Sequence, residues 1–415
     1  MEQRKKTKQN HRPVSPYLQG KTKQTEEKPA EKTREGQCPL YKKCNGCQLQ
    51  NMTYDQQLRW KQKKVEQRLG RFHEVSPILG MEHPYHYRNK VQAAFGMNRS
   101  GQVISGVYQS TTGRIVPVDT CLIEDEKADQ IVVSIRKLMK SFRMTPYQSD
   151  KGMGFLRHVL VKRGFVSGEI MVVLVTTSPI FPAKNNFVKA LRKEHPEITT
   201  ILMNVSKGDV NLVLGEQEKV LFGPGSIEET LCGCRFRISA QSFYQVNPVQ
   251  TEVLYQKAIE LAGLTGKETV LDAYCGIGTI GLIASRQAKQ VIGVEVNQDA
   301  VRDAIANAKR NQIKNIYFHH ADAGELMTAM AADKEKVDVV FMDPPRSGSD
   351  EAFLSAVTVL DPDRLVYISC NPDTQERDLA YLTAHGYQVQ TIQPVDMFPH
   401  THHIECICLL TRREP

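Results

Sequence analysis

A cysteine near the C-terminus stands where a predicted strand ends, and its thiol could do covalent chemistry. Residues 365–369 have the composition of a strand, and Cys370 follows them directly. Asn371-Pro372 favours a turn at this point, so the thiol can reach a cleft beyond the strand. A cysteine in such a place is a candidate nucleophile, although a single cysteine is more often a small buried hydrophobe.

Glu405 is the only acidic residue in an otherwise apolar predicted strand, residues 404–410. An isolated ionised carboxylate is costly to bury, so this side chain should lie at the mouth of the strand or have a raised pKa. Both situations suit a general base, and the alternative is a strand-end residue paired with Arg346. The preceding histidines, His402 and His403 among them, could be ligands, but packing and hydrogen bonding are their commoner roles.

A second strand end carries a carboxylate. The predicted strand 337–342 is followed by Asp343-Pro344-Pro345-Arg346, and ligands of doubly wound sheets bind beyond the carboxyl ends of the strands. Asp343 should therefore face the site. Methylases of exocyclic amines carry an aromatic residue after Asp-Pro-Pro, so Arg346 argues against amine methylation.

A glycine-rich loop predicts a nucleotide-like ligand. Gly276, Gly278 and Gly281 spell G-x-G-x-x-G between a predicted strand and a predicted helix, which is the dinucleotide fingerprint. Glu295 ends the next strand and could hold ribose hydroxyl groups. On these residues alone, NAD and S-adenosylmethionine (SAM) are both candidates.

Two further acids favour SAM. Asp272 ends the strand before the glycines, where a carboxylate suits the cationic methionyl end of SAM and suits a pyrophosphate poorly. Asp322 follows a third predicted strand, a common place to bind the adenine amino group in methyltransferases.

Ten cysteines in a chain expected to be cytoplasmic are poor disulfide candidates, and three of them have the spacing of ligands. Cys38, Cys44 and Cys47 form C-x5-C-x2-C, which needs a fourth thiolate to complete a Cys₄ site. Cys121 is the best candidate, with Cys232-Gly233-Cys234 as a rival on spacing. The spacing allows zinc or a [4Fe–4S] cluster.

Alternating helices and strands after about residue 248 should position the strand-end residues, and they predict a parallel, doubly wound α/β sheet. Residues 85–240 read as an antiparallel, sheet-rich region with a helix at 125–142. A helix at 53–69 has Thr53 and Gln56 as a capping box and Gly70 as its end. Its basic residues, Arg59, Lys61, Lys63, Lys64 and Arg68, are expected to surround the apolar face.

The charge is concentrated near the N-terminus. The chain has a net charge of +8 over 415 residues, yet residues 1–72 carry +11 and residues 73–415 carry −3. We expect a disordered basic tail at 1–36, a cysteine region with a basic helix at 37–84, a sheet-rich region at 85–240 that contributes Cys121, and the ligand-binding domain at 241–415. No apolar run is long enough to cross a bilayer, and no secretory signal is evident, which predicts a cytoplasmic protein without a membrane partner.

Several ordered motifs together resemble the RNA 5-methyluridine methyltransferases, and the cysteine cluster resembles the iron–sulfur branch that modifies 23S rRNA. The motifs are the segment 241–247 (QSFYQVN), the glycine loop, Asp343-Pro344-Pro345-Arg346, Ser369-Cys370-Asn371-Pro372 and the segment 398–405 (FPHTHHIE). The resemblance implies a C-terminal Rossmann-like SAM-dependent methyltransferase domain, a sheet-rich central RNA-binding domain and a small N-terminal iron–sulfur region.

The resemblance also implies roles for single residues. Cys370 would be the nucleophile and Glu405 the base, Phe243 would stack on a flipped uracil, and Arg346 is a candidate donor near O4 by its location. The implied SAM contacts are Gln245, Tyr274, Glu295 and Asp343, with Asp322 near the adenine. The implied ligands of a [4Fe–4S] cluster are Cys38, Cys44, Cys47 and Cys121.

The predicted function is SAM-dependent methylation of C5 of one uridine in 23S rRNA, in a loop or single-stranded segment, by a monomer. RNA 5-methylcytosine enzymes place a cysteine beside their Pro-Pro motif, and residues 343–346 lack one. The alternatives are a tRNA uracil-C5 methyltransferase, a non-catalytic iron–sulfur RNA-binding protein and, third, an NAD oxidoreductase.

Overall fold

The computed structural model describes residues 38–109, 111–148, 151–206 and 213–413. The predicted basic tail, residues 1–36, lies outside these ranges. No helix in the described ranges is long and apolar enough to cross a bilayer.

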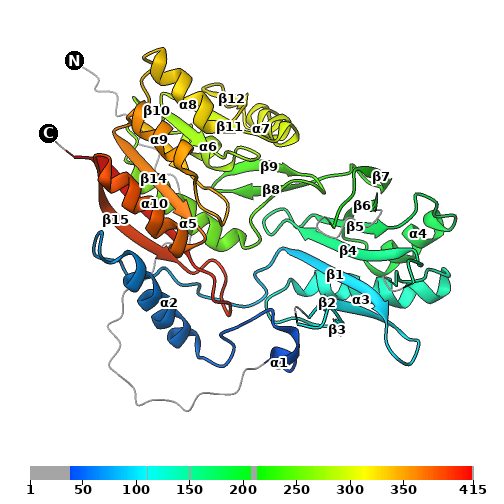
Figure 1. The fold of residues 1–415 in the computed structure, drawn as a ribbon. Coiled ribbons are helices and arrows are strands. Elements are labelled where there is room, and N and C mark those ends of the chain that lie inside the picture. Colours follow the sequence, from blue (N-terminus) through cyan, green and yellow to red (C-terminus); the bar gives the residue numbers. More distant parts are fainter. Residues whose placement is uncertain (1–37, 110, 149–150, 207–212, 414–415) are drawn as a thin grey trace, which may run out of the picture. The chain divides into compact units, whose positions relative to one another are not determined.

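The C-terminal part of the chain contains a seven-stranded sheet in the order β12-β11-β10-β13-β14-β16-β15, and Figure 1 shows helices packed around it. Its strands are β10 (Thr269–Ala273), β11 (Gln290–Glu295), β12 (Ile316–His320), β13 (Val339–Met342), β14 (Arg364–Ser369), β15 (Tyr387–Val395) and β16 (Glu405–Arg412). The α/β class is confirmed, but the expectation of a wholly parallel sheet is wrong. Among these strands β16 alone runs against the others, because the chain turns back after β15 and inserts between β14 and β15.

Helices cover both faces of this sheet, and alternate residues of each strand divide between the two layers. The helices are α5 (Pro248–Ala262), α6 (Thr279–Ala284), α7 (Gln298–Arg310), α8 (Ala323–Ala332), α9 (Glu351–Leu360) and α10 (Pro372–Ala384). Val270 of β10 packs with α5, α6 and α7, whereas Leu271 packs with α8, α9 and α10. This alternation is the period of two that a strand buried on both faces requires.

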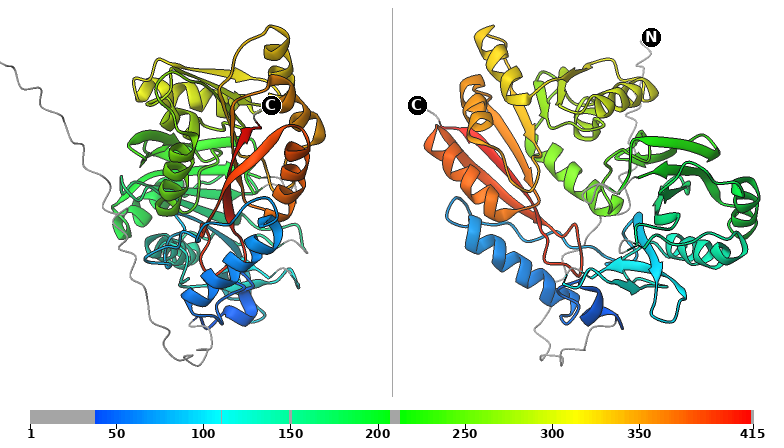
Figure 2. Two further views of the ribbon diagram at one scale, coloured as in Figure 1. Left: turned by 90° about the vertical axis from the view of Figure 1, so that its left-hand side faces the viewer. Right: turned by 45° about the vertical axis from the view of Figure 1, so that its right-hand side comes forward.

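The N-terminal helix α2 (Tyr54–Leu69) joins the second of these layers. Thr53 and Gln56 form the expected capping box, and Val65 and Leu69 pack with α10 and the edge strand β15. The right-hand view of Figure 2 shows α2 beside α10. Lys61 was expected on the solvated basic side. It is instead fully buried and paired with Asp396 at 2.5 Å, because α2 lies against the C-terminal sheet rather than in open solvent.

The central sheet also has seven strands, in the order β3-β2-β1-β4-β5-β6-β7. They are β1 (Lys90–Met97), β2 (Val103–Tyr108), β3 (Ile115–Pro117), β4 (Leu156–Arg163), β5 (Ile170–Thr176), β6 (Ile198–Val205) and β7 (Gln217–Phe222). The expectation of an antiparallel sheet is wrong for one pair: β5 and β6 are parallel, because α4 (Lys184–Glu194) carries the chain back to the same edge. Parallel neighbours need such a crossover.

Smaller elements complete the described chain. The helix α3 (Glu126–Ser141) packs on the central sheet, the short helix α1 (Tyr41–Cys44) lies in the cysteine region, and β8 (Ile227–Leu231) pairs with β9 (Cys234–Ile238).

Candidate active site

Three chain segments bring the candidate catalytic residues to one edge of the C-terminal sheet. Asp343 follows β13 and Cys370 follows β14, so both lie at the carboxyl ends of parallel neighbours. Glu405 is the first residue of β16, where Cys406 pairs with Ser369 at the end of β14. The reversed direction of β16 therefore matters, because a parallel last strand would begin at the opposite edge and separate Glu405 from Cys370.

Burial and the neighbouring carboxyl groups favour the neutral form of the Cys370 thiol. Burial raises the pKa of Cys370 to about 11, and the carboxyl groups of Glu405 and Asp343 act in the same direction, whereas Arg346 opposes them. Cys370 also lies next to Asn371, the N-cap residue of α10, and the N-terminal end of this helix favours a thiolate. Ionisation of this thiol therefore depends on Arg346 and the start of the helix.

Both carboxyl groups have raised pKa values. Burial raises the pKa of Asp343 to about 7, and burial with the neighbouring Asp343 raises the pKa of Glu405 well above its usual value. The alternative of an ion pair between Glu405 and Arg346 is not seen among the described residues. The Arg346 Nη2 atom instead lies 3.2 Å from His403 Nδ1.

The glycine loop is shaped by two carboxylates from neighbouring strands. Asp272 accepts a hydrogen bond from the Gly281 N–H at 2.7 Å, and a side chain at Gly281 would meet that carboxylate at 2.9 Å. Glu295 accepts from the N–H groups of Gly276 at 3.0 Å and Asn297 at 2.8 Å. Asp272 was expected to meet the methionyl end of SAM; at 1% exposure, its visible partner is the loop itself.

A cavity of about 850 Å³ opens beside this loop. Three of the five predicted SAM contacts line it, namely Tyr274, Glu295 and Asp322. The Tyr274 ring lies 5.0 Å from the ring of Phe353, and Asp322 caps α8 through the Glu325 N–H. The cavity thus offers an aromatic wall and four acidic residues, Glu295, Asp322, Glu325 and Asp350.

The other two predicted contacts, Gln245 and Asp343, do not line this cavity. They lie around the hydroxyl group of Tyr255, a fully buried residue of α5 whose neighbours also include Thr279 and Asp272. Sequence reasoning missed Tyr255 and Phe353, because each reads as an ordinary apolar position on a helix.

Phe243 is presented to solvent between β9 and α5. Its side chain is 71% exposed, although the adjacent Tyr244 is 6% exposed and lies in the core. The buried Tyr244 side chain anchors the backbone next to Phe243, and the exposed Phe243 ring remains available for stacking.

Comparison with known proteins identifies the family. A family model described as tRNA (uracil-5-)-methyltransferase matches residues 53–413. The chain belongs to this family. The resemblance seen in the sequence is thereby confirmed at the level of uracil-5 methyltransferases that act on RNA.

Individual relatives agree with this assignment. A protein of Halalkalibacterium halodurans described as an uncharacterized RNA methyltransferase is 45% identical over 381 residues, which is 91% of this chain and 83% of the relative. A relative from Listeria monocytogenes with the same description is 44% identical over 377 residues, 90% of this chain and 83% of its own. The solved Pyrococcus abyssi tRNA (uracil-54, C5)-methyltransferase, in complex with S-adenosyl-L-homocysteine, has a TM-score of 0.75 and 27% identity, covering 88% of this chain and 86% of that one.

The cysteines of this uracil-5-methyltransferase family member divide into separate groups. Cys38, Cys44, Cys47 and Cys121 line one cavity of about 240 Å³. The rival Cys232-Gly233-Cys234 lies elsewhere, with the Cys232 N–H donating to Glu252. Within the ranges that the structure describes, no three His, Cys, Asp or Glu side chains are placed to hold a single metal ion.

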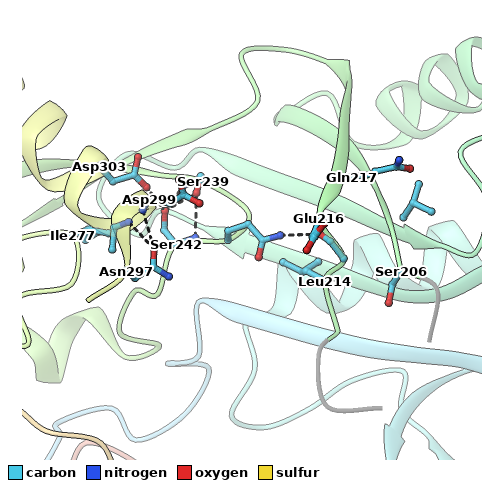
Figure 3. A pocket seen from close by; sticks show the side chains of 14 residues that line it. Ser206, Leu214, Glu216, Gln217, Ser239, Ser242, Ile277, Asn297, Asp299 and Asp303 are labelled. Atoms are coloured by element: carbon cyan, nitrogen blue, oxygen red, sulfur yellow. Dashed lines mark hydrogen bonds between the residues drawn. The ribbon is translucent and has the colours of Figure 1, made fainter. Parts of the chain in front are cut away.

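A further cavity of about 690 Å³ lies beside α7 and includes neither Cys370 nor Glu405 (Figure 3). Glu216, Asp299 and Asp303 are its acidic residues, and their charge would repel RNA phosphates. Its wall includes Ser239 and Ser242, which belong to the segment leading to Phe243.

Proposed function

We propose that this family member methylates C5 of a uridine in 23S rRNA, with SAM as the methyl donor. The observation that carries the proposal is the meeting of Cys370, Glu405, Asp343 and Arg346 at one sheet edge. A thiol, a buried carboxyl group and a guanidinium are the groups that uracil C5 methylation needs.

The residues present fit the donor. Tyr274, Glu295 and Asp322 line a cavity large enough for it, and the similar Pyrococcus abyssi enzyme contains S-adenosyl-L-homocysteine. When bound, SAM supplies an electrophilic methyl group. We propose that Asp322 holds the adenine end, Glu295 the ribose, and that Gln245 and Asp343 line the path toward Cys370.

The protein's part in the reaction follows from the weak nucleophilicity of uracil C5. The Cys370 thiolate adds to C6, and the electron pair of the C5–C6 bond moves toward C5 and O4 as an enolate. Arg346 can donate a hydrogen bond to O4 in this state. Once C5 carries the methyl group, Glu405 removes the C5 proton, the C5–C6 double bond forms again and the C6–S bond breaks.

The uracil must leave its stack to reach Cys370. We propose that Phe243 stacks on the flipped base, which suits RNA in a loop or single strand. Since rRNA is the proposed substrate, we place the protein in the cytoplasm. We also propose that it acts as a monomer.

The cysteine group supports 23S rRNA over tRNA as the substrate, because it resembles the iron–sulfur branch of the family, which modifies 23S rRNA. We propose that Cys38, Cys44, Cys47 and Cys121 hold a [4Fe–4S] cluster, because thiolates are its usual ligands and all four side chains line one cavity. Burial raises the pKa of Cys47 to about 11, so this thiol becomes a ligand only as it loses its proton. The cluster would tie the region around α1 to the central part of the chain.

Mapping 5-methyluridine by mass spectrometry in rRNA and tRNA should identify the substrate. A strain that lacks this protein should lose at least one 5-methyluridine from 23S rRNA and keep those of its tRNA. Loss from tRNA alone would favour the tRNA alternative. Unchanged RNA of both kinds would favour a non-catalytic RNA-binding protein.

Iron content tests the cluster ligands. Cys121→Ala should lose most of its bound iron and the brown absorbance of the purified protein, because it removes one of four proposed ligands. Cys232→Ala is the matched control, since Cys232 is also partly buried but lies outside the cavity. Full iron in Cys121→Ala, or equal loss in the control, would contradict the ligand assignment.

A further inference from the structure

A buried lysine of the central sheet holds the segment that leads to Phe243. Lys162 of β4 is 6% exposed, and its ammonium group donates to the carbonyl oxygens of Ser239 at 2.8 Å, Ala240 at 2.9 Å and Ser242 at 2.9 Å. Lysine is almost never buried without partners. Here the three ammonium hydrogens meet three backbone acceptors within four residues.

Side chains within this segment hold it further, and Figure 3 shows them on the wall of the acidic cavity. The hydroxyl groups of Ser239 and Ser242 lie 2.7 Å apart, and the Ser242 hydroxyl donates to Asp303 of α7 at 3.0 Å. The segment is thus bonded to the central sheet through Lys162, and to α7, which covers the C-terminal sheet, through Ser242.

The chain is held again on the far side of Phe243. The Asn89 side chain donates to the Gln245 carbonyl at 3.2 Å, and the Asn89 N–H donates to Val246 at 2.8 Å. Asn89 directly precedes β1, whose Lys90 is the register partner of Lys162 on β4. The exposed Phe243 therefore lies between two anchors that belong to one pair of strands.

We propose that Lys162 is a positioning residue for the target base. By bonding three backbone carbonyl groups it fixes the segment 239–242, which presents Phe243 to the uracil. The proposal rests on the proposed function, because it assumes that Phe243 stacks on the substrate. When the backbone on either side of the ring is already held, less conformational freedom is lost as the ring stacks, so the base binds more readily to a fixed segment than to a loose one.

Lys162→Met is the direct test. Burial and the nearby Lys90 lower the pKa of Lys162 to about 7, against the opposing carboxylates of Glu218 and Asp303. Burying the ammonium is thus costly in itself, and methionine keeps the apolar stem without this cost. We expect kcat/KM on unmodified 23S rRNA transcript to fall roughly tenfold to hundredfold, the range of one stacked base, with unchanged affinity for S-adenosylhomocysteine.

A double-mutant cycle shows whether the effect passes through Phe243. Phe243→Ala should lower kcat/KM by a similar factor, and the double variant should be no worse than Phe243→Ala alone, because coupled residues are not additive. Lys90→Met is the matched control: it removes a neighbouring lysine that, within the described chain, makes no hydrogen bond to this segment. We expect it to retain the wild-type kcat/KM.

Ser242→Ala keeps the test decisive if Lys162→Met fails to fold. It removes the tie to Asp303 from a partly exposed side chain, and it should give a smaller loss that Phe243→Ala also masks. The positioning role would be overturned if the loss of kcat/KM in Lys162→Met or Ser242→Ala added to the loss in Phe243→Ala. It would also be overturned if whichever of these two variants folds kept the wild-type kcat/KM. Failure of the wild-type protein to methylate or trap the transcript would instead overturn the proposed function.

Discussion

Cys370→Ser should reduce methylation by roughly 10⁴-fold or more, the scale on which removal of a covalent nucleophile acts. Serine preserves the size of the side chain and its place before α10, but its hydroxyl group does not ionise in the accessible pH range. Cysteine is the better nucleophile because a thiolate can form. In this site Arg346 favours that thiolate, while Glu405 and Asp343 oppose it.

A 23S rRNA transcript containing 5-fluorouridine makes the result specific. With fluorine at C5 there is no proton for the base to remove, so the covalent complex persists and can be seen as a slower band on a denaturing gel. Wild-type protein should form this complex and Cys370→Ser should not. Both proteins should bind S-adenosylhomocysteine equally, since Cys370 does not line the cavity beside the glycine loop.

Cys232→Ser serves as the matched control, because Cys232 is partly buried like Cys370 and has no proposed task. It should trap the RNA as the wild-type protein does. If Cys370→Ser still formed the complex, or methylated at more than about a hundredth of the wild-type rate, another residue would be the nucleophile.

The sequence located the candidate site wherever local order was enough. Cys370 and Asp343 each follow a strand of strong β composition, and a strand end can be recognised without knowing the strand's neighbours. The glycine loop is equally local. Its positive φ angles at Tyr274, Gly276 and Gly278 belong to residues close together in the chain, although Glu295 of the next strand also holds the loop.

The sequence did not predict features that depend on pairing across the chain. The direction of β16 is decided by its neighbours β14 and β15, so the apolar run of residues 404–410 looks the same in either orientation. The parallel pairing of β5 with β6 was not predicted for the same reason. Lys61 reads as one more cation on a basic helix, because its partner Asp396 is far away in sequence.

The same limit applies to residues that act through others. Lys162 lies beside Arg163 at the end of β4, opposite Lys90 of β1, and charged residues at a strand end normally indicate exposure to solvent. Its three carbonyl partners come from a segment about 80 residues later. Only the folded chain shows that this lysine is turned inward toward the segment that carries Phe243.

Glu405→Gln should slow release of the methylated RNA by roughly 10²- to 10⁴-fold, the usual contribution of a general base. Glutamine keeps the shape and buried position of the side chain but cannot accept the C5 proton. The variant should still add Cys370 to C6 and accept the methyl group at C5. It then cannot eliminate the thiol, so a methylated covalent adduct should accumulate on ordinary uridine RNA, where the wild-type protein releases its product.

The pH dependence of the methylation rate is an independent test of Glu405 as the base. Glu405 acts as a base only when ionised, and burial with Asp343 raises its pKa well above the usual value. The wild-type rate should therefore fall as the pH drops through this raised pKa, at a higher pH than an exposed glutamate would give. In Glu405→Gln this acidic limb should disappear from the rate of product release.

Mass spectrometry of the trapped protein decides between a base and a structural role. The adduct of Glu405→Gln should join Cys370 to C6 of the uracil and carry one added methyl group at C5, and the double variant Cys370→Ser/Glu405→Gln should form no adduct. An adduct without the methyl group would mean that Glu405 is needed before methyl transfer, and free methylated RNA at the wild-type rate would mean that another group takes the proton. The expected adduct, by contrast, requires that the reversed strand β16 brings its first residue within reach of the C5 proton while the thiol is still bound at C6.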